Sequence, residues 1–185
     1  MPGRRTTVTS VLAAMGVGLS LGLCGCAGAS PSAASPPIVS ASPAFSTLQP
    51  SVLPPVPPFS YSDSADSQQS LERGRVGRVS SAFSGGVSRD LLLEGQVVGG
   101  VLFYRFAPHV ASSERVHFPP MIVYTFAGAS PHQAKVGGQV VQRVDRTADG
   151  RTVIGWTHND YVVVVWTRDL KVATTYAGDY ILRNM

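Results

Sequence analysis

The chain is poor in cysteine. Its two cysteines, Cys24 and Cys26, both lie at the end of the first apolar run of the sequence. If that run is removed during export, the rest of the chain can form no intramolecular disulfide and no cysteine-based metal or redox site. We therefore expect the folded part to depend on its apolar core alone.

Lysine is also scarce, because Lys135 and Lys171 are its only occurrences and arginine supplies the other positive charges. The formal net charge is +4. A nucleic-acid-binding protein usually gathers basic residues on one face with aromatic side chains between them. No such cluster is visible, so we expect no nucleic-acid partner.

Motifs that carry catalysis are missing as well. The chain has no G-x-S-x-G nucleophile elbow and no glycine-rich phosphate loop. Its histidines are scattered and lack the i,i+4 spacing of helical metal ligands; they are His109, His117, His132 and His158. The sequence predicts no enzyme, no cofactor and no metal site. A hydrolase whose site is assembled without a local motif stays open as an alternative.

The first residues have the layout of an export signal. Arg4 and Arg5 precede an uncharged apolar stretch over residues 8–23. This stretch is shorter than the roughly 20 apolar residues that a spanning helix needs. A signal peptide over residues 1–25 is therefore predicted. Thr7 stands where a twin-arginine signal normally has a large apolar residue, which favours simple positive charge.

The motif Leu23-Cys24-Gly25-Cys26 resembles the lipobox of bacterial lipoproteins. Cys24 departs mildly from the family pattern, which prefers a small residue there. The resemblance implies that the thiol of Cys26 carries a diacylglycerol, with acyl chains such as palmitate, and holds the chain on the outer face of the cell membrane. Two alternatives stay open: cleavage after Ala29, which would release a secreted protein, and an uncleaved anchor.

A segment over residues 26–75 is rich in serine, proline and alanine. Prolines lack a backbone donor and force extended neighbours, and few large side chains offset the ordering entropy. We predict a disordered spacer. Near its end stand Arg73, Arg75 and Arg78, separated by glycines. They could touch anionic lipid or wall polymers, or form only a solvated collar.

A folded domain is predicted over residues 76–185. Residues 88–95 fit either a short helix or a strand. Branched and aromatic residues predict strands over 97–106, 121–126, 136–146, 152–157 and 161–166. A bulge or bend is expected at Gly99-Gly100, and tight turns at 148–150 and 158–160. The uniformly apolar run 161–166 predicts a central strand covered on both faces.

Helical spacing at the end of the chain predicts a helix over 168–184, capped by Thr167. The expected fold class is α+β: an antiparallel meander of four to six strands with the C-terminal helix on one face. This arrangement resembles small uncharacterised envelope lipoproteins of actinobacteria.

Exposed aromatic rings near a turn are the candidates for ligand contact. Trp156, His158 and Tyr161 flank the predicted turn, and core packing is the competing interpretation of the two aromatic residues. The sequence therefore favours a lipid-anchored, extracytoplasmic binding or interaction module. Its partner would be an unidentified envelope protein or wall polymer. A sensory or accessory domain of a membrane complex is a further alternative.

Overall fold

A computed structural model describes residues 45–63, 69, 71 and 80–184. Cys26, Arg73, Arg75 and Arg78 lie outside these residues, as does the predicted signal peptide. The described strands are β1 (Ser46–Thr47), β2 (Phe59–Ser62), β3 (Phe83–Leu93), β4 (Gln96–Phe106), β5 (His132–Val136), β6 (Gln139–Val144), β7 (Thr152–His158) and β8 (Tyr161–Thr167). The helices are α2 (Phe118–Ala127) and α3 (Leu170–Asn184), with 3-10 turns η1 (Pro50–Val52), η2 (Ser80–Ala82) and η3 (Arg115–His117).

The fold is α+β, as predicted, and the eight strands form one sheet. The strand order is β1-β3-β4-β8-β7-β6-β5, and β2 also pairs with β3. All pairings are antiparallel except that of β1 with β3. The sheet therefore has more strands than the predicted four to six.

Strand β8 lies between β4 and β7, in agreement with the prediction of a central strand. Its side chains alternate between two buried clusters. Val162, Val164 and Trp166 face one side of the sheet, whereas Val163 and Val165 face the other. A strand with both faces buried reads as an unbroken apolar run, which is why this element could be recognised.

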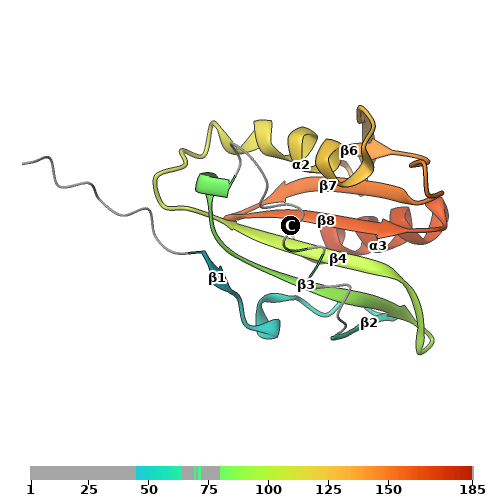
Figure 1. The fold of residues 1–185 in the computed structure, drawn as a ribbon. Helices are drawn as coiled ribbons and strands as arrows, with labels where there is room; N and C mark the ends of the chain where they lie inside the picture. The colour runs from blue at the N-terminus through green and yellow to red at the C-terminus, as the bar shows by residue number, and fades with distance from the viewer. Residues whose placement is uncertain (1–44, 64–68, 70, 72–79, 185) are drawn as a thin grey trace, which may run out of the picture. The chain divides into compact units, whose positions relative to one another are not determined.

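Of the helices described in full, α3 covers one face of the sheet and α2 the other (Figure 1). Helix α3 packs on β7 and β8 through side chains such as Tyr176 and Ile181. Helix α2 packs on the opposite face through Ile122 and Val123. The molecule therefore has a helix–sheet–helix layering, and the predicted C-terminal helix forms one of the two outer layers.

The prediction of a strand over 121–126 is wrong, because these residues belong to α2. Pro119 and Pro120 sit in the first turn of the helix, where a missing N–H costs no internal hydrogen bond. Gly128 ends the helix in a left-handed conformation and donates its N–H to the carbonyl of Tyr124 at 2.8 Å. The ten-residue apolar run fits a helix that packs on a sheet as well as it fits a strand.

The structure selects one of the two predicted alternatives for residues 88–95 and corrects one further element. Residues 88–95 form the end of strand β3 and the turn at Glu94-Gly95, both with positive φ. The predicted strand 136–146 is interrupted by a turn at Gly137-Gly138, whose left-handed conformations favour glycine. The bulge expected at Gly99 is confirmed, since Val98 has no pairing partner between Val97 and Gly99 in the β3–β4 ladder.

Part of the predicted spacer is folded onto the sheet. Leu48, Leu53, Val56 and Phe59 are buried in the α3-side core, and the N–H of Leu48 donates to Gly86 of β3 at 2.8 Å. The prediction that this part of the spacer is disordered is therefore wrong. The short strands β1 and β2 contain none of the prolines of the segment, so its few apolar side chains reach the core without placing a proline in a strand pairing. We call residues 45–62 the strap.

Helix α3 begins two residues later than predicted, and its cap differs accordingly. The carboxylate of Asp169 accepts a hydrogen bond from the N–H of Lys171 at 2.7 Å, so Asp169 caps the helix. Thr167, the predicted cap, instead accepts from the N–H of Asp169 at 3.2 Å.

Candidate functional site

The structure brings the three predicted contact residues, Trp156, His158 and Tyr161, close together. They lie beside the ring of Tyr180, at the edge of the hydrophobic core. His158 and Tyr161 are cross-strand partners, and Trp156 lies on the same face of the sheet two residues earlier. The Tyr180 ring of α3 contacts Trp156 and His158, with centroid distances of 5.3 Å and 5.4 Å. Trp156 is only 1% exposed, so its ring is part of the core and not an exposed platform.

His158 and Tyr161 remain half-buried at the edge of this cluster. Burial lowers the pKa of His158, which favours its neutral form. The side chain of Asn159 makes a hydrogen bond to Nε2 of His158 at 2.9 Å. The neutral, half-buried imidazole of His158 and its hydrogen bond to Asn159 therefore serve packing at the end of the sheet.

Tyrosine hydroxyls fasten the strap to α3. Tyr61 of β2 donates to the carbonyl of Pro54 at 2.8 Å, and its oxygen lies 3.0 Å from the hydroxyl of Tyr176. Burial raises the pKa of Tyr61, and burial together with the neighbouring Tyr61 raises that of Tyr176. Both groups are therefore neutral donors and acceptors over the ordinary pH range, and their role is structural.

A hollow of the surface lies where β4 begins and β8 ends. It has a volume of about 550 Å³, within the range of small-molecule sites. Most of its lining residues come from β3, β4, β8 and the turn before β7, and Gln69 and Arg168 lie outside these elements. The lining residues are Gln69, Asp90, Val97, Val98, Gly99, Asp149, Arg151, Trp166, Thr167 and Arg168. We call it the Trp166 cleft.

Two glycines of β4 allow Trp166 to approach closely: Gly100 leaves room for its indole, and Gly99 for its backbone carbonyl. A Cβ on Gly100 would lie 2.2 Å from Cζ2 of Trp166, and one on Gly99 would lie 1.9 Å from the Trp166 carbonyl oxygen. The ring of Phe126 from α2 stacks against the indole at a centroid distance of 5.6 Å. The indole is thus fixed between a strand backbone and a helix side chain, a preorganised apolar surface.

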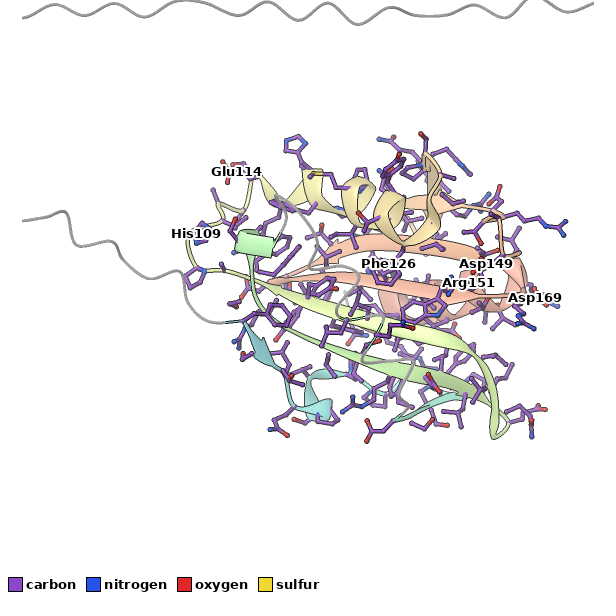
Figure 2. The ribbon with its side chains drawn as sticks, viewed as in Figure 1. His109, Glu114, Phe126, Asp149, Arg151 and Asp169 are labelled. Atoms are coloured by element: carbon purple, nitrogen blue, oxygen red, sulfur yellow. The ribbon has the colours of Figure 1, made fainter. Side chains whose placement is uncertain are left out.

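Charged side chains gather at the same end of the sheet, where Figure 2 shows Asp149, Arg151 and Asp169. Arg151 Nη2 lies 2.5 Å from Oδ2 of Asp149. The hydrogen bond from Arg151, followed by that from Thr147, lowers the pKa of Asp149 to about 2. The charge of Arg151 is therefore largely compensated by Asp149 within the turn.

Arg168 is different, because it is exposed and forms no ion pair with any described residue. Asp90, the other carboxylate of the cleft, already takes part in an interaction of its own. Among the described residues, Arg168 is thus a positive charge of the cleft without an ion-pair partner, and the apolar side chains of Val97, Val98 and Trp166 also line the cleft.

The lowered pKa of Asp149 keeps this carboxylate of the cleft ionised near neutral pH. A carboxyl group that acts as a general acid near neutral pH needs a raised pKa, whereas the pKa of Asp149 is lowered. The hydroxyl of Thr167 donates to the carbonyl of Asp169 at 2.5 Å. Within the described part of the chain, no three His, Cys, Asp or Glu side chains are grouped to hold a metal ion.

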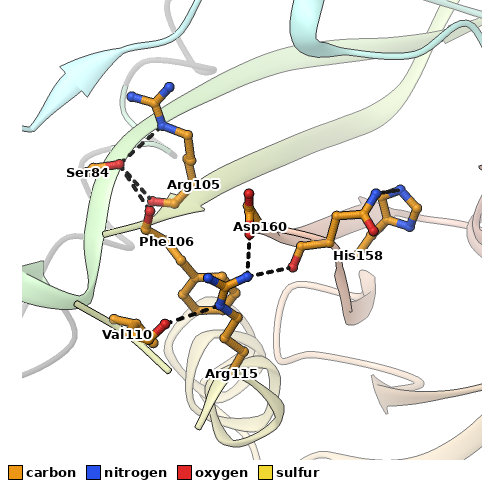
Figure 3. A network of polar contacts seen from close by, with 8 residues as sticks. Ser84, Arg105, Phe106, Val110, Arg115, His158 and Asp160 are labelled. Carbon is orange, nitrogen blue, oxygen red and sulfur yellow. Dashed lines mark hydrogen bonds and ion pairs between the residues drawn. The ribbon is translucent and has the colours of Figure 1, made fainter. Parts of the chain in front are cut away.

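Arg115 fastens the long loop that follows β4 (Figure 3). Its guanidinium donates to the carbonyls of Val110 and Asn159 at 3.4 Å and 3.3 Å and pairs with the carboxylate of Asp160. It also lies over the Phe106 ring at 5.2 Å. These contacts tie the loop to the β7–β8 turn.

No protein-family model, curated protein or solved structure matches this chain. Among the helices that the structure describes, neither α2 nor α3 combines the length and the apolar character needed to cross a membrane. The function is therefore argued from the geometry of the domain.

The sequence interpretation missed the Trp166 cleft. Asp149 lies within the predicted turn 148–150, and Arg151 follows that turn. Arg168 is the first residue of the predicted helix 168–184. The sequence contained one indication of the cleft, the glycine pair Gly99-Gly100 together with Trp166. This indication can be interpreted only when the β4–β8 register is known, because that register places Gly100 opposite Trp166.

Proposed function

We propose that this protein is a non-enzymatic, lipid-anchored extracytoplasmic binding module, and that the Trp166 cleft is its ligand site. The observation that carries the proposal is the cleft itself: about 550 Å³, lined by Trp166, whose indole lies between Gly100 and Phe126, and by Arg168, which has no ion-pair partner among the described residues. A preformed hollow that combines apolar side chains with a few charged groups is the usual form of a small-molecule site.

The ligand class follows from the charges. Arg151 is paired with Asp149, and Arg168 has no described partner. A ligand with a carboxylate, sulfonate or phosphate group would pair with Arg168, and its apolar part would lie against Val97 and Trp166. The cleft therefore favours an amphipathic anion, free or displayed on an envelope protein or wall polymer.

The anchor is the second half of the proposal. A diacylglycerol on Cys26 would hold the domain outside the cell membrane, and cleavage after Ala29 would release it instead. From Cys26 to the first described residue, Phe45, the chain advances 19 positions (45 − 26). Fully extended, that length spans at most roughly 65 Å. Phe45, where the described domain begins, would then lie within this distance of the membrane surface.

A fluorescent amphipathic anion tests the cleft directly. The probe is anilinonaphthalene sulfonate, titrated into the full chain purified in detergent. Arg168→Glu should weaken its binding by roughly tenfold or more, because a charge-assisted bond contributes about 1.5–3 kcal/mol and is replaced by repulsion. Lys135→Glu is the matched control, since it changes the charge equally on the exposed side of the distant edge strand β5.

The two variants separate the outcomes. Loss of binding in Arg168→Glu with retention in Lys135→Glu supports the cleft. Equal binding in both variants, with both folded by circular dichroism, contradicts the proposal. Turnover of envelope ester or glycoside substrates by the wild-type chain would favour the hydrolase alternative.

A further inference from the structure

Strand β4 extends past the end of β8 at the Trp166 cleft. The pairing of the two antiparallel strands begins at Gly99 with Thr167, and β4 starts earlier, at Gln96. After Thr167 the chain leaves the sheet through Arg168 and leads into α3. Among the described residues, no strand therefore lies along the β8 side of residues 96–98. We call residues 96–98 the open edge of β4.

The backbone of Val97 points its two polar groups toward this open side. Leu93 and Gln96 are paired across the turn Glu94-Gly95, in which both residues have positive φ. Such a two-residue turn closes on a pair that exchanges both hydrogen bonds, and the next residue of each strand points its N–H and carbonyl to the other side. Val97 is that next residue, opposite Leu92. Its N–H and carbonyl therefore face away from β3, on the side where the described part of the chain provides no strand.

The open edge belongs to the cleft. Val97 and Val98 both line it, and Val97 is 62% exposed. An unpaired donor and acceptor on a strand edge form a template for pairing with another extended chain. The cleft thus combines three features in one place: apolar side chains, a free pair of main-chain groups, and the guanidinium of Arg168.

We propose that the ligand of the Trp166 cleft is the C-terminal end of an extended peptide, displayed by an extracytoplasmic protein, which adds a short strand beside Val97. This inference rests on the binding function proposed above and names the ligand class. An exposed strand edge binds a peptide through main-chain hydrogen bonds, while pockets beside it take the side chains. A fatty acid or a sugar acid has the charge for Arg168 but lacks the alternating N–H and carbonyl groups that pair with a strand.

The position of Arg168 determines the direction of the peptide. Arg168 follows Thr167, so it lies at the point where β8 stops and the open edge begins. A peptide that runs parallel to β4 brings its C-terminus to this point, whereas an antiparallel peptide brings its N-terminus. Arg151 is paired with Asp149, and Arg168 is exposed without an ion-pair partner among the described residues. A free carboxylate that pairs with Arg168 therefore selects the parallel direction.

Parallel pairing specifies which groups of the peptide form bonds. In a parallel ladder, one residue bonds to the two residues that flank its neighbour. The N–H of Val97 donates to the carbonyl of the third-last peptide residue. The N–H of the last peptide residue donates to the carbonyl of Val97. The N–H of the second-last residue points away from β4 and makes no bond to it.

Displacement of anilinonaphthalene sulfonate from the full chain in detergent tests the ligand class. The probes are acetylated tripeptides that end in valine, leucine or phenylalanine, each with a free carboxylate, and at least one should displace the dye. The C-terminal amide of that peptide should bind about tenfold more weakly or worse, because the charge-assisted bond to Arg168 is lost. N-methylation of its last residue should weaken binding several-fold by removing the bond to Val97. N-methylation of its second-last residue is the matched control and should change the affinity by less than about twofold, since that N–H makes no bond to β4.

Two substitutions at one position test the edge from the protein side. Val97→Pro removes the N–H that donates to the peptide, and a proline is tolerated where the N–H of a strand residue faces outward. Val97→Ala is the matched control, because it shortens the same side chain and keeps the N–H. The peptide should bind several-fold more weakly to Val97→Pro than to Val97→Ala, and the two variants should bind the dye equally.

The outcomes separate this inference from the proposed function. If the dye binds in an Arg168-dependent manner and no peptide displaces it, the inference is overturned and the proposed function stands. Equal affinity of the acid and the amide, or of the two N-methylated peptides, also overturns the inference. If Val97→Pro is unfolded by circular dichroism, the peptide series on the wild-type chain decides. Failure of the dye itself to bind contradicts both proposals.

Discussion

Phe126 and Trp166 stack with their ring centroids 5.6 Å apart and their planes inclined by 28°. Phe126 lies on α2 and Trp166 on the central strand β8, so this single contact joins the outer helix to the floor of the cleft. The stack limits the motion of the Trp166 indole, which lies against the backbone of Gly100 on its other side.

The first prediction concerns this stack. Phe126→Ala should remove the aromatic contact and part of the α2 packing, and lower the free energy of unfolding by about 1–3 kcal/mol, since Phe126 is only partly buried. Urea denaturation measures the loss, and anilinonaphthalene sulfonate titration should show weaker binding. Phe126→Leu, which keeps apolar bulk, should lose less stability. Unchanged probe affinity in Phe126→Ala would contradict a role of the stack in the cleft.

A pair of glycine substitutions makes the second prediction. Gly100→Ala should destabilise the domain by at least about 1–3 kcal/mol, because its Cβ would lie 2.2 Å from the indole of Trp166. Gly178→Ala is the matched control in α3, where the Cβ would meet Val136 at an ordinary 3.7 Å. It should stabilise by roughly 0.5–1 kcal/mol through helix propensity. Thermal unfolding of both variants should therefore shift in opposite directions.

The third prediction is a pH dependence at the alkaline end. The pKa values of Tyr61 and Tyr176 are raised in the folded protein above their usual value near 10. Stability that depends on their neutral forms is complete below the unfolded pKa and is lost as pH rises beyond it. Urea unfolding should therefore give a nearly constant free energy of unfolding from neutral pH to about pH 9.5, and a falling one above about pH 10. The fall should be less steep in Tyr176→Phe.

The fourth prediction is a weaker dependence at the acid end. The folded pKa of Asp149 is lowered to about 2 by Arg151 and Thr147. Its contribution is present above the unfolded pKa near 3.8 and is lost as pH falls toward 2. Because the Asp149 side chain is half-exposed, we expect it to contribute less than about 1 kcal/mol to the free energy of unfolding. Asp149→Asn should remove the part of the acid-induced loss of stability that Asp149 causes, as measured by urea unfolding at several acidic pH values. The same pH dependence in Asp149→Asn and in the wild-type chain would contradict the prediction.

The contrast between β8 and α2 explains how much of the fold could be predicted. The run 161–166 is too short for a helix and is bounded by turn residues, so its apolar character indicated a buried strand correctly. Residues 118–127 are equally apolar, and Pro119-Pro120 suits either the start of a strand or the first turn of a helix. Tertiary packing against Gly155 favours the helix there, and no local pattern contains that information.

The cleft was beyond prediction for a related reason. Its charged residues come from three separate parts of the sequence, and Asp90 and Arg168 are separated by most of the domain. Only the strand order β3-β4-β8-β7 brings them to one end of the sheet. The strap was misjudged because its apolar residues are too sparse to suggest a core segment until β3 provides an edge for them to pair with.

Native mass spectrometry of the full chain, extracted from the envelope of the producing cells, tests the lipid anchor and the ligand site of the Trp166 cleft together. We expect a diacylglycerol mass on Cys26 and a bound small anion in the wild-type chain and in Lys135→Glu. We expect the anion to be missing from Arg168→Glu. A bound mass that is equally present in Arg168→Glu, or no bound mass in any of the three chains, would contradict the account.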